Sequence, residues 1–338
     1  MQNPLSDCAI CPRRCHADRA AGGLGWCRAG AGLSIGSICL HRGEEPVISG
    51  PEGICNIFFA RCNLQCLYCQ NYQISRTDAP VAAREWTLAE AVARVREFLA
   101  AGVPRVGFVS PSHCIPQMEA LMDALANAEC AARPRAENGQ TEPALPSNQK
   151  SEFRNQNSEI PPSVRPIFVM NTSAYDTVET LRRLEGRMDV YLPDLKYMDS
   201  ALAARLSGAA DYPPIAAAVL REMFRQKGGN IWLAEDGGIE SGLIVRHLVL
   251  PGQVENSKAC LRFIAEELSP SVHLSLLAQY RPTPAVASDP DLGRLLRAEE
   301  YQEVLDEMER LGFYRGWTQQ LISAGNYNPD FQRPNPFE

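Results

Sequence analysis

Residues 54–71 read Ile-Cys-Asn-Ile-Phe-Phe-Ala-Arg-Cys-Asn-Leu-Gln-Cys-Leu-Tyr-Cys-Gln-Asn. The first seven are almost all apolar, which is typical of a strand buried on both faces of a parallel sheet. The loop that follows spaces Cys62, Cys66 and Cys69 as C-x3-C-x2-C. Three thiolates in so short a loop can hold three corners of a cubane iron–sulfur cluster and leave the fourth iron open to a small molecule. A closed zinc site usually has four protein ligands, so the triplet favours a cluster with one open iron.

The chain after this loop alternates between apolar runs and amphipathic helical stripes. Further strands are expected at residues 106–109, 167–170, 190–192, 243–250 and 272–277. A strand followed by a helix, repeated about six times, predicts a parallel sheet with right-handed crossovers. The number of repeats is below that of a closed eight-unit barrel. The expected fold class is therefore α/β: a partial (β/α)6 TIM-like barrel with a small cysteine-rich N-terminal extension.

The sequence divides into three parts. Residues 1–50 form the cysteine-rich, metal-binding extension, residues 51–285 the barrel, and residues 286–338 a C-terminal helical extension. Residues 131–166 interrupt the barrel with a polar segment rich in Pro, Asn and Gln that has no apolar period. Such a composition predicts a disordered insertion.

The N-terminal extension contains a second cysteine group. Its members are spaced C-x2-C-x3-C-x11-C and are Cys8, Cys11, Cys15 and Cys27. Four thiolates suit either a tetrahedral zinc ion or a second iron–sulfur cluster, and the spacing does not choose between them. Metal binding would stabilise a segment that has little apolar material of its own.

The overall composition excludes some classes of function. The 338 residues are 45% hydrophobic and include 33 Lys and Arg against 40 Asp and Glu, for a net charge of −7. An acidic chain is poorly suited to bind phosphate backbones, so no nucleic-acid partner is expected. No apolar stretch is long enough to span a bilayer, so no membrane association is expected either. The first residues show no basic segment followed by an apolar one, as a signal peptide would. The expected location is the cytoplasm.

Polar residues follow the expected strands at the edge where barrels of this type place their active sites. Asn171 and Thr172 follow the third strand, Asp194 and Lys196 follow the fourth, and Arg246 lies within the fifth. Asp194 and Lys196 are two apart, so in an extended chain both project to one side. They suit a zwitterionic ligand, or they form an ordinary ion pair. Arg246, in an otherwise apolar strand, needs an anionic partner from the protein or from a ligand.

The cysteine loop, with the aromatic Tyr68 directly before Cys69, resembles the signature of the radical SAM superfamily. That resemblance implies a [4Fe–4S] cluster held by Cys62, Cys66 and Cys69, with S-adenosylmethionine (SAM) chelating the open iron. One electron from the cluster would cleave SAM to methionine and a 5′-deoxyadenosyl radical, which abstracts a hydrogen atom. The resemblance implies an oxidoreductase with the same partial barrel, and no side chain is assigned a catalytic role apart from cofactor binding.

Further stretches resemble glycyl-radical-enzyme activases of the pyruvate formate-lyase activating enzyme type. These stretches are residues 171–173, 194–196 and 246–252, while the cysteine-rich N-terminus and residues 41–46 and 191–197 resemble a less characterised relative of that group. The resemblance implies that Tyr68 packs near the adenine of SAM. It also implies that the SAM pocket is lined by Asn171, Thr172, Asp194, Lys196 and Arg246. The implied partners are a protein or peptide substrate, in the first instance a glycyl radical enzyme, and a flavodoxin- or ferredoxin-type electron donor.

The chain departs from the pattern of these families at two places. Radical SAM enzymes commonly carry Gly-Gly-Glu after the second strand, where its carboxylate receives the amino group of SAM, but residues 110–113 are Ser-Pro-Ser-His. Asn171 stands where the best-known activases have an acidic residue. Two alternatives therefore stay open: radical SAM modification of a different peptide or a small molecule, and a zinc-binding protein without catalysis.

Overall fold

A computed structural model describes residues 3–126, 165–325 and 328–338, and the fold is reported for these residues. The segment expected to be a disordered insertion, residues 131–166, lies outside them apart from its last two residues. The strands are β1 (Leu33–His41), β2 (Ile54–Phe59), β3 (Arg84–Trp86), β4 (Arg105–Val109), β5 (Ile167–Thr172), β6 (Val190–Pro193), β7 (Trp232–Leu233), β8 (Ile239–Leu248), β9 (His273–Leu277) and β10 (Gly316–Thr318).

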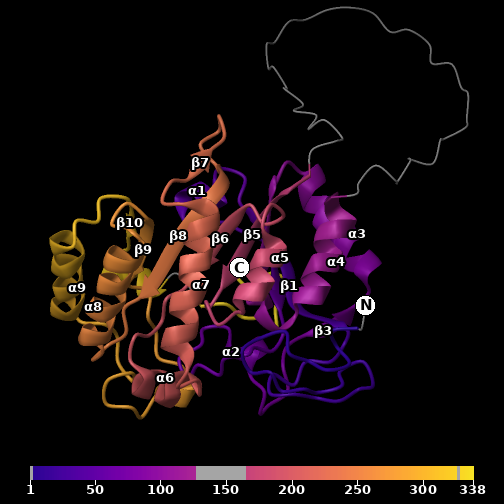
Figure 1. The fold of residues 1–338 in the computed structure, drawn as a ribbon, viewed down its shortest axis with the longest axis horizontal. Coiled ribbons are helices and arrows are strands. Elements are labelled where there is room, and N and C mark those ends of the chain that lie inside the picture. Colours follow the sequence, from indigo (N-terminus) through magenta and orange to yellow (C-terminus); the bar gives the residue numbers. More distant parts are fainter. Residues whose placement is uncertain (1–2, 127–164, 326–327) are drawn as a thin grey trace, which may run out of the picture.

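These strands form one open, mostly parallel sheet in the order β3-β1-β2-β4-β5-β6-β8-β9-β10, with β7 paired to β8 (Figure 1). The six strands expected from the sequence are β2, β4, β5, β6, β8 and β9, and each pairs in parallel with the next. Within the described residues the outermost strands, β3 and β10, do not pair with each other. The expected α/β class with an incomplete barrel is therefore confirmed.

The edges of the sheet contain strands that the sequence analysis did not place. β10 joins in parallel to β9, with Trp317 opposite Ser275. At the other edge β1 pairs antiparallel with both β2 and β3. Part of the N-terminal extension and part of the C-terminal extension thus belong to the same sheet as the barrel strands.

Helices follow most of the parallel strands. They are α1 (Pro46–Ser49), α2 (Tyr72–Ser75), α3 (Leu88–Ala100), α4 (Ile115–Ala126), α5 (Val178–Leu184), α6 (Ser200–Ser207), α7 (Tyr212–Lys227), α8 (Val254–Phe263) and α9 (Ala298–Arg310). Figure 1 shows α9, α8, α7, α5 and α4 following one another across the molecule. No helix in the described part of the chain has the length and apolar character needed to cross a bilayer.

Sequence signals account for where several helices start and end. Thr87 caps α3: its side chain accepts a hydrogen bond from the backbone N–H of Glu90, and Glu90 reaches back to Thr87. This reciprocal pair satisfies amide groups that the first helical turn leaves without partners. Helix α6 ends at Gly208, whose φ of 62° favours glycine. These local signals keep the connections short and hold the strand ends close to one another.

The short helix α1 closes the inside of the barrel at the amino-terminal ends of the strands. Its Ile48 is buried in one cluster with Ile54, Val190 and Ile239, which lie at or near the start of their strands. Burying this apolar cluster fixes the loop between β1 and β2 at the amino-terminal ends of the strands. Residues just before α1 therefore form the floor of the space that the strands enclose.

Candidate active site

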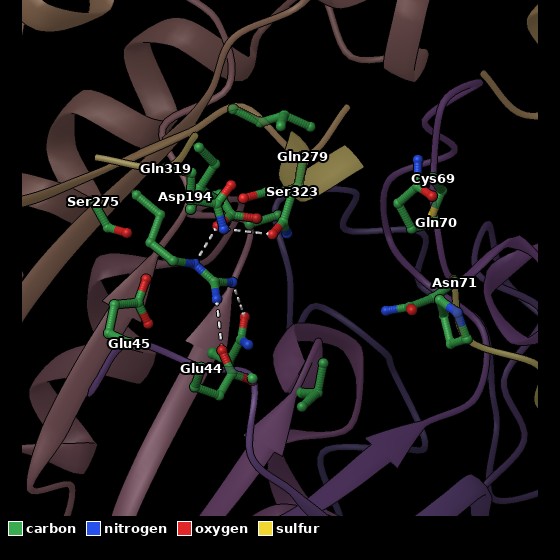
Figure 2. A pocket seen from close by; sticks show the side chains of 18 of the residues that line it. Glu44, Glu45, Cys69, Gln70, Asn71, Asp194, Ser275, Gln279, Gln319 and Ser323 are labelled. Carbon is green, nitrogen blue, oxygen red and sulfur yellow. Dashed lines mark hydrogen bonds and ion pairs between the residues drawn. The ribbon is translucent and has the colours of Figure 1, made fainter. Parts of the chain in front are cut away.

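A cavity of about 580 Å³ lies within the partial barrel. Its wall is formed by residues that follow β2, β4, β5 and β6 and by residues on β8, β9 and β10. All nine residues that the sequence analysis places in the barrel site line it; they are Cys62, Cys66, Tyr68, Cys69, Asn171, Thr172, Asp194, Lys196 and Arg246. Figure 2 shows Cys69, Gln70 and Asn71 on one side of this space and Glu44, Glu45 and Asp194 on the other. The structure thus joins the cysteine loop and the charged strand ends in one cavity.

Backbone hydrogen bonds hold the cysteine loop in place. Arg61, with a φ of +69°, turns the chain directly after β2, and its backbone N–H donates to the carbonyl oxygen of Ile74 at 2.6 Å. On the other side, the Leu67 N–H donates to the Leu206 carbonyl at the end of α6, at 2.8 Å. The loop is therefore tied both to α2 and to α6, which limits the ways in which its three sulfurs can move.

Two of the three sulfurs accept hydrogen bonds from serine hydroxyls. Ser207 Oγ lies 2.9 Å from Cys66 Sγ, and Ser75 Oγ lies 3.3 Å from Cys69 Sγ. Burial raises the pKa of Cys66, although nearby Lys196 opposes that rise. Without a metal this sulfur is therefore a thiol; a bound metal would favour the thiolate. Hydrogen bonds to cysteine sulfurs are among the features that tune iron–sulfur clusters, so this donor set fits such a cluster.

The spacing of potential ligands argues against a single metal ion. Among the described residues, no three His, Cys, Asp or Glu side chains are placed to hold one ion together. Thiolates bound to one zinc lie about 2.3 Å from it and hence roughly 4 Å from each other. A cubane instead binds each thiolate to a different iron, so its ligands stand farther apart. The choice of a cubane therefore rests on the spacing of the three cysteines in the loop and on the serine donors to their sulfurs.

Tyr68 is held from behind by a chain of hydroxyl groups. Tyr197 donates to the Tyr68 hydroxyl at 2.6 Å, and the Tyr197 hydroxyl also lies 2.7 Å from Ser207 Oγ. Because Ser207 contacts Cys66 in turn, the chain connects Tyr68 to one of the three sulfurs. Tyr68 is only 5% exposed and packs edge-on against Tyr197. Its ring is therefore fixed in the cavity wall.

Arg246 is the centre of a network of half-buried polar groups, of which Figure 2 labels Asp194 and Glu44. Its Nε donates to Asp194 Oδ1 at 2.8 Å, its Nη1 to Glu44 Oε2 at 3.0 Å, and its Nη2 to Asn171 Oδ1 at 2.6 Å. Asp194 also accepts from Lys196 Nζ at 2.8 Å. The anionic partners that the sequence required for Arg246 are therefore two carboxylates of the protein itself.

The charges in this network stabilise one another. Burial alone would raise the pKa of Asp194, but Arg246 and Lys196 lower it to about 2. Burial likewise opposes the charge of Lys196, and Asp194 outweighs that effect and raises the pKa of the lysine. Both side chains are therefore charged at neutral pH. Lys196 has three N–H donors and gives one to Asp194, so it can donate to a ligand carboxylate in the cavity.

The segment that replaces Gly-Gly-Glu offers hydroxyl groups in place of a carboxylate. Ser110 lines the cavity, and Ser112 Oγ lies 3.1 Å from Thr172 Oγ1. His113 is buried, with its Nε2 2.8 Å from the Ala60 carbonyl oxygen, and burial lowers its pKa to about 4. His113 therefore supports the loop after β2 and is neutral at physiological pH.

Two acidic residues of the cavity were missed by the sequence analysis. Glu44 and Glu45 lie in the loop between β1 and α1 and form part of the cavity wall. The sequence gives residues 41–46 only a likeness to a relative, because it does not indicate that the N-terminal extension packs against the barrel. The signal was present in the two acidic residues directly before Pro46 at the start of α1. Only the packing of α1 against the amino-terminal ends of the strands shows that Glu44 and Glu45 reach the cavity.

The second cysteine group lies elsewhere. Its members form no disulfide and do not line the cavity; they are Cys8, Cys11, Cys15 and Cys27. Arg13, in the middle of this segment, donates from its Nε to the Asn63 carbonyl at 2.9 Å, so the segment docks on the cysteine loop of the barrel. Burial raises the pKa of Cys11, and the charges of Cys27, Cys8 and Cys15 add to that rise, so the four thiols lie near one another. No three described side chains are placed to hold a single ion, and the zinc ion or second cluster expected here stays a prediction.

Comparison with known proteins yields partial likenesses. No family model matches the chain. An uncharacterized protein of Methanocaldococcus jannaschii is 26% identical over 318 residues, covering 91% of this chain and 76% of that protein. A pyruvate-formate lyase-activating enzyme domain from Bacteroides vulgatus has a TM-score of 0.33 and 16% identity, covering 46% of this chain and 82% of the domain.

Two larger solved structures are also similar. HydG, a maturase of the [FeFe]-hydrogenase, has a TM-score of 0.49 and 11% identity, covering 78% of this chain and 51% of HydG. A spore photoproduct lyase has a TM-score of 0.42 and 13% identity, covering 77% of this chain and 73% of the lyase. The chain thus spans about half the length of HydG. The assignment of a function therefore depends on the residues of the cavity.

Proposed function

We propose that the chain is a radical SAM enzyme. In this proposal it cleaves SAM reductively at a [4Fe–4S] cluster held by Cys62, Cys66 and Cys69, and then removes a hydrogen atom from a protein or peptide substrate. One observation carries the proposal: a single cavity contains both the three-cysteine loop and the charged network of Asp194 and Lys196. A cluster ligand set beside groups that match a zwitterion is what SAM binding requires.

In this proposal, different residues of the cavity bind different parts of SAM. Lys196 can donate to the carboxylate of SAM, because two of its N–H groups are not used by Asp194. The fixed ring of Tyr68 offers a flat surface next to the cysteines. Apolar side chains such as Phe58, Val109 and Leu248 line the same cavity and limit the access of water. When bound, the cluster supplies the single electron that cleaves the sulfonium of SAM.

The volume of the cavity suits a small molecule or cofactor. A cavity of about 580 Å³ falls within the range of roughly 300–1,000 Å³ of small-molecule and cofactor sites. We infer that part of a substrate enters beside SAM. The likeness of residues 171–173, 194–196 and 246–252 to glycyl-radical-enzyme activases supports a protein or peptide substrate. It likewise supports a flavodoxin- or ferredoxin-type protein as the electron donor.

The direct test is anaerobic reconstitution with iron and sulfide, followed by reduction with dithionite in the presence of SAM. We expect about four irons and four sulfides per chain, as one cubane requires, and the formation of 5′-deoxyadenosine. Metal analysis and chromatography of the products measure both. A protein that takes up zinc alone, or that holds a cluster but forms no deoxyadenosine, contradicts the proposal.

Replacing Lys196 by Ala should weaken the binding of SAM. The variant loses a charged donor to the ligand carboxylate, which corresponds to roughly a tenfold or greater rise in the dissociation constant. Calorimetry with the reconstituted protein measures the affinity, and iron analysis should give the same cluster content as the wild type. The matched control is Lys258→Ala. It removes a lysine of α8 that lies outside the cavity and forms ion pairs with Glu255 of the same helix and Glu303 of α9. Equal affinity in both variants would exclude Lys196 from the SAM site.

A further inference from the structure

Glu45 places a carboxylate without a full set of partners in the wall of the cavity. The residue is only 7% exposed, and its Oε2 has no hydrogen-bond partner in the described part of the chain. Buried polar atoms in proteins are normally paired, and an exception calls for an explanation such as an absent water, ion or ligand. Because this oxygen belongs to a residue of the cavity wall, a bound molecule can supply the missing partner.

The cavity is lined by one more carboxylate than it has cations, and Glu45 is the carboxylate without an ion pair in the described part of the chain. The described ionisable residues of the cavity include two cations, Lys196 and Arg246, and three carboxylates, Asp194, Glu44 and Glu45. Both cations form ion pairs with the other two carboxylates. The charge of Arg246 also acts on Glu45 and lowers its pKa, although Glu45 forms no ion pair within the described residues. The cavity can therefore accept one further positive charge next to Glu45.

The surroundings of Glu45 suit an organic cation. Ser275 of β9 lies beside it, as Figure 2 shows, and Trp317 of β10 stands opposite Ser275 in the strand register. Trp317 also lines the cavity and packs on the cluster of Ile48 beneath it. A cavity wall that contains both an aromatic side chain and a carboxylate is a favourable setting for ammonium and guanidinium groups. Burial raises the pKa of Glu45, against the effect of Arg246, and a bound cation would favour its ionised form.

The position of Glu45 separates this site from the groups of SAM that bind iron. In Figure 2 Glu45 lies at the opposite end of the cavity from Cys69. The amino and carboxylate groups of SAM must reach the open iron at the cysteine loop if the proposed function holds. The amino group of SAM is therefore not the expected partner of Glu45, which leaves the second molecule in the cavity.

We propose that Glu45, with Trp317 in the same cavity wall, binds a positively charged nitrogen group of the substrate, an ammonium or a guanidinium. This inference rests on the proposed function, and it narrows the substrate to molecules that carry such a group at the end that enters the cavity. The group belongs either to a small amine or to a Lys or Arg side chain of a peptide. Both sources share the same chemistry at Glu45.

The test compares charged with uncharged probes of equal size on the full chain, reconstituted with its cluster. The small probes are butylammonium and butylguanidinium against 1-butanol and butylurea. The peptide probes are acetyl-Gly-Arg-Gly-amide against the same peptide with citrulline in place of Arg. Calorimetry is expected to show that charged probes bind at least about tenfold more tightly to the wild type, as a charge-assisted contact provides. Tighter binding of the arginine peptide than of butylguanidinium supports a peptide as the source, and the reverse order supports a small amine.

Variants assign the preference to one residue. Glu45→Gln, which keeps the shape but removes the charge, should lose the preference for charged probes. Glu52→Gln, an exposed glutamate in the loop between α1 and β2, should keep it. An unchanged preference in Glu45→Gln, or equal binding of butylammonium and 1-butanol to the wild type, overturns the inference. The wild-type comparison decides even if Glu45→Gln fails to fold.

The two proposals fail in different ways. Probe binding is an equilibrium measurement that does not require SAM cleavage. Absence of deoxyadenosine with an intact charge preference contradicts only the proposed reaction. Deoxyadenosine formation without a charge preference contradicts only the role of Glu45.

Discussion

Replacement of Cys66 by Ala is expected to abolish the formation of 5′-deoxyadenosine. Cys66 is the middle cysteine of the loop, and its sulfur faces the same cavity as Lys196 and accepts a hydrogen bond from Ser207. If the proposed function holds, the variant leaves only two thiolates in the loop, so the cubane would lose one of its three anchors and SAM would lose the iron that it chelates. Product formation should fall to the background of the assay, and iron content after anaerobic reconstitution should fall with it.

The variant should still fold, because the sulfur of Cys66 contributes little to the core. Far-ultraviolet circular dichroism and a urea unfolding curve check this point. The matched control is Cys260→Ala on α8, a cysteine that is fully buried and lies outside both cysteine groups. The control should lose some stability through the small cavity it leaves, but it should keep both iron and deoxyadenosine formation. Unchanged product formation by Cys66→Ala would falsify the assignment of this loop.

The barrel could be predicted because its strands have a strong local signal. Runs such as residues 54–59 and 105–109 are buried along their whole length, so each reads as a nearly continuous apolar segment, interrupted only by Asn56 and Arg105. The polar residues after these runs could be placed at one edge, because parallel strands bring their carboxyl ends together. That rule correctly gathers Asn171, Asp194 and the cysteine loop around one cavity.

The remaining parts of the site depend on contacts that the local sequence does not reveal. β10 has three residues and gains its place only by pairing with β9. Glu45 reaches the cavity because Ile48, three residues later, is buried among the strands of the barrel. Both features join the ends of the chain to its middle, and periodicity within a short window carries no information on such pairings. The extensions therefore complete a site that the sequence analysis assigned to the barrel alone.

The sequence identifies Arg246 and Asp194 as candidate site residues, but it does not show that they contact each other. An arginine in an apolar strand indicates that an anionic partner lies nearby. Its two partners, Asp194 and Glu44, are 52 and 202 residues away along the chain, so the sequence does not identify them. Figure 2 shows Asp194 and Glu44 on the same side of the cavity, where one guanidinium can contact both. Arg246 thus links the loop between β1 and α1, which contains Glu44, to the loop after β6, which contains Asp194.

Replacement of Arg246 by Met is expected to destabilise the fold strongly. The side chains of Arg246, Asp194 and Glu44 are 13%, 25% and 10% exposed, so the variant leaves two largely buried carboxylates without their shared cation. Removal of one partner from a buried pair typically costs about 3–5 kcal/mol. Urea unfolding measures this loss in the free energy of unfolding. The control is Arg262→Met on α8, whose ion pair with Glu307 is 42% exposed on the arginine side and should contribute only about 0–1 kcal/mol.

A double variant separates the pairing from the loss of the arginine itself. Arg246→Met combined with Glu44→Gln removes the charge that the single variant leaves unpaired, because Asp194 keeps its ion pair with Lys196, so the double variant should be more stable than the sum of the two single effects predicts. For residues in direct contact, such coupling amounts to about 0.5–3 kcal/mol. Additive effects, or an Arg246→Met variant as stable as Arg262→Met, would show that the network does not hold the fold together. In that case Arg246 would be free to serve a ligand. A coupled result instead means that Arg246 is committed to the protein's own carboxylates, which leaves Lys196 as the cation that the cavity offers to SAM.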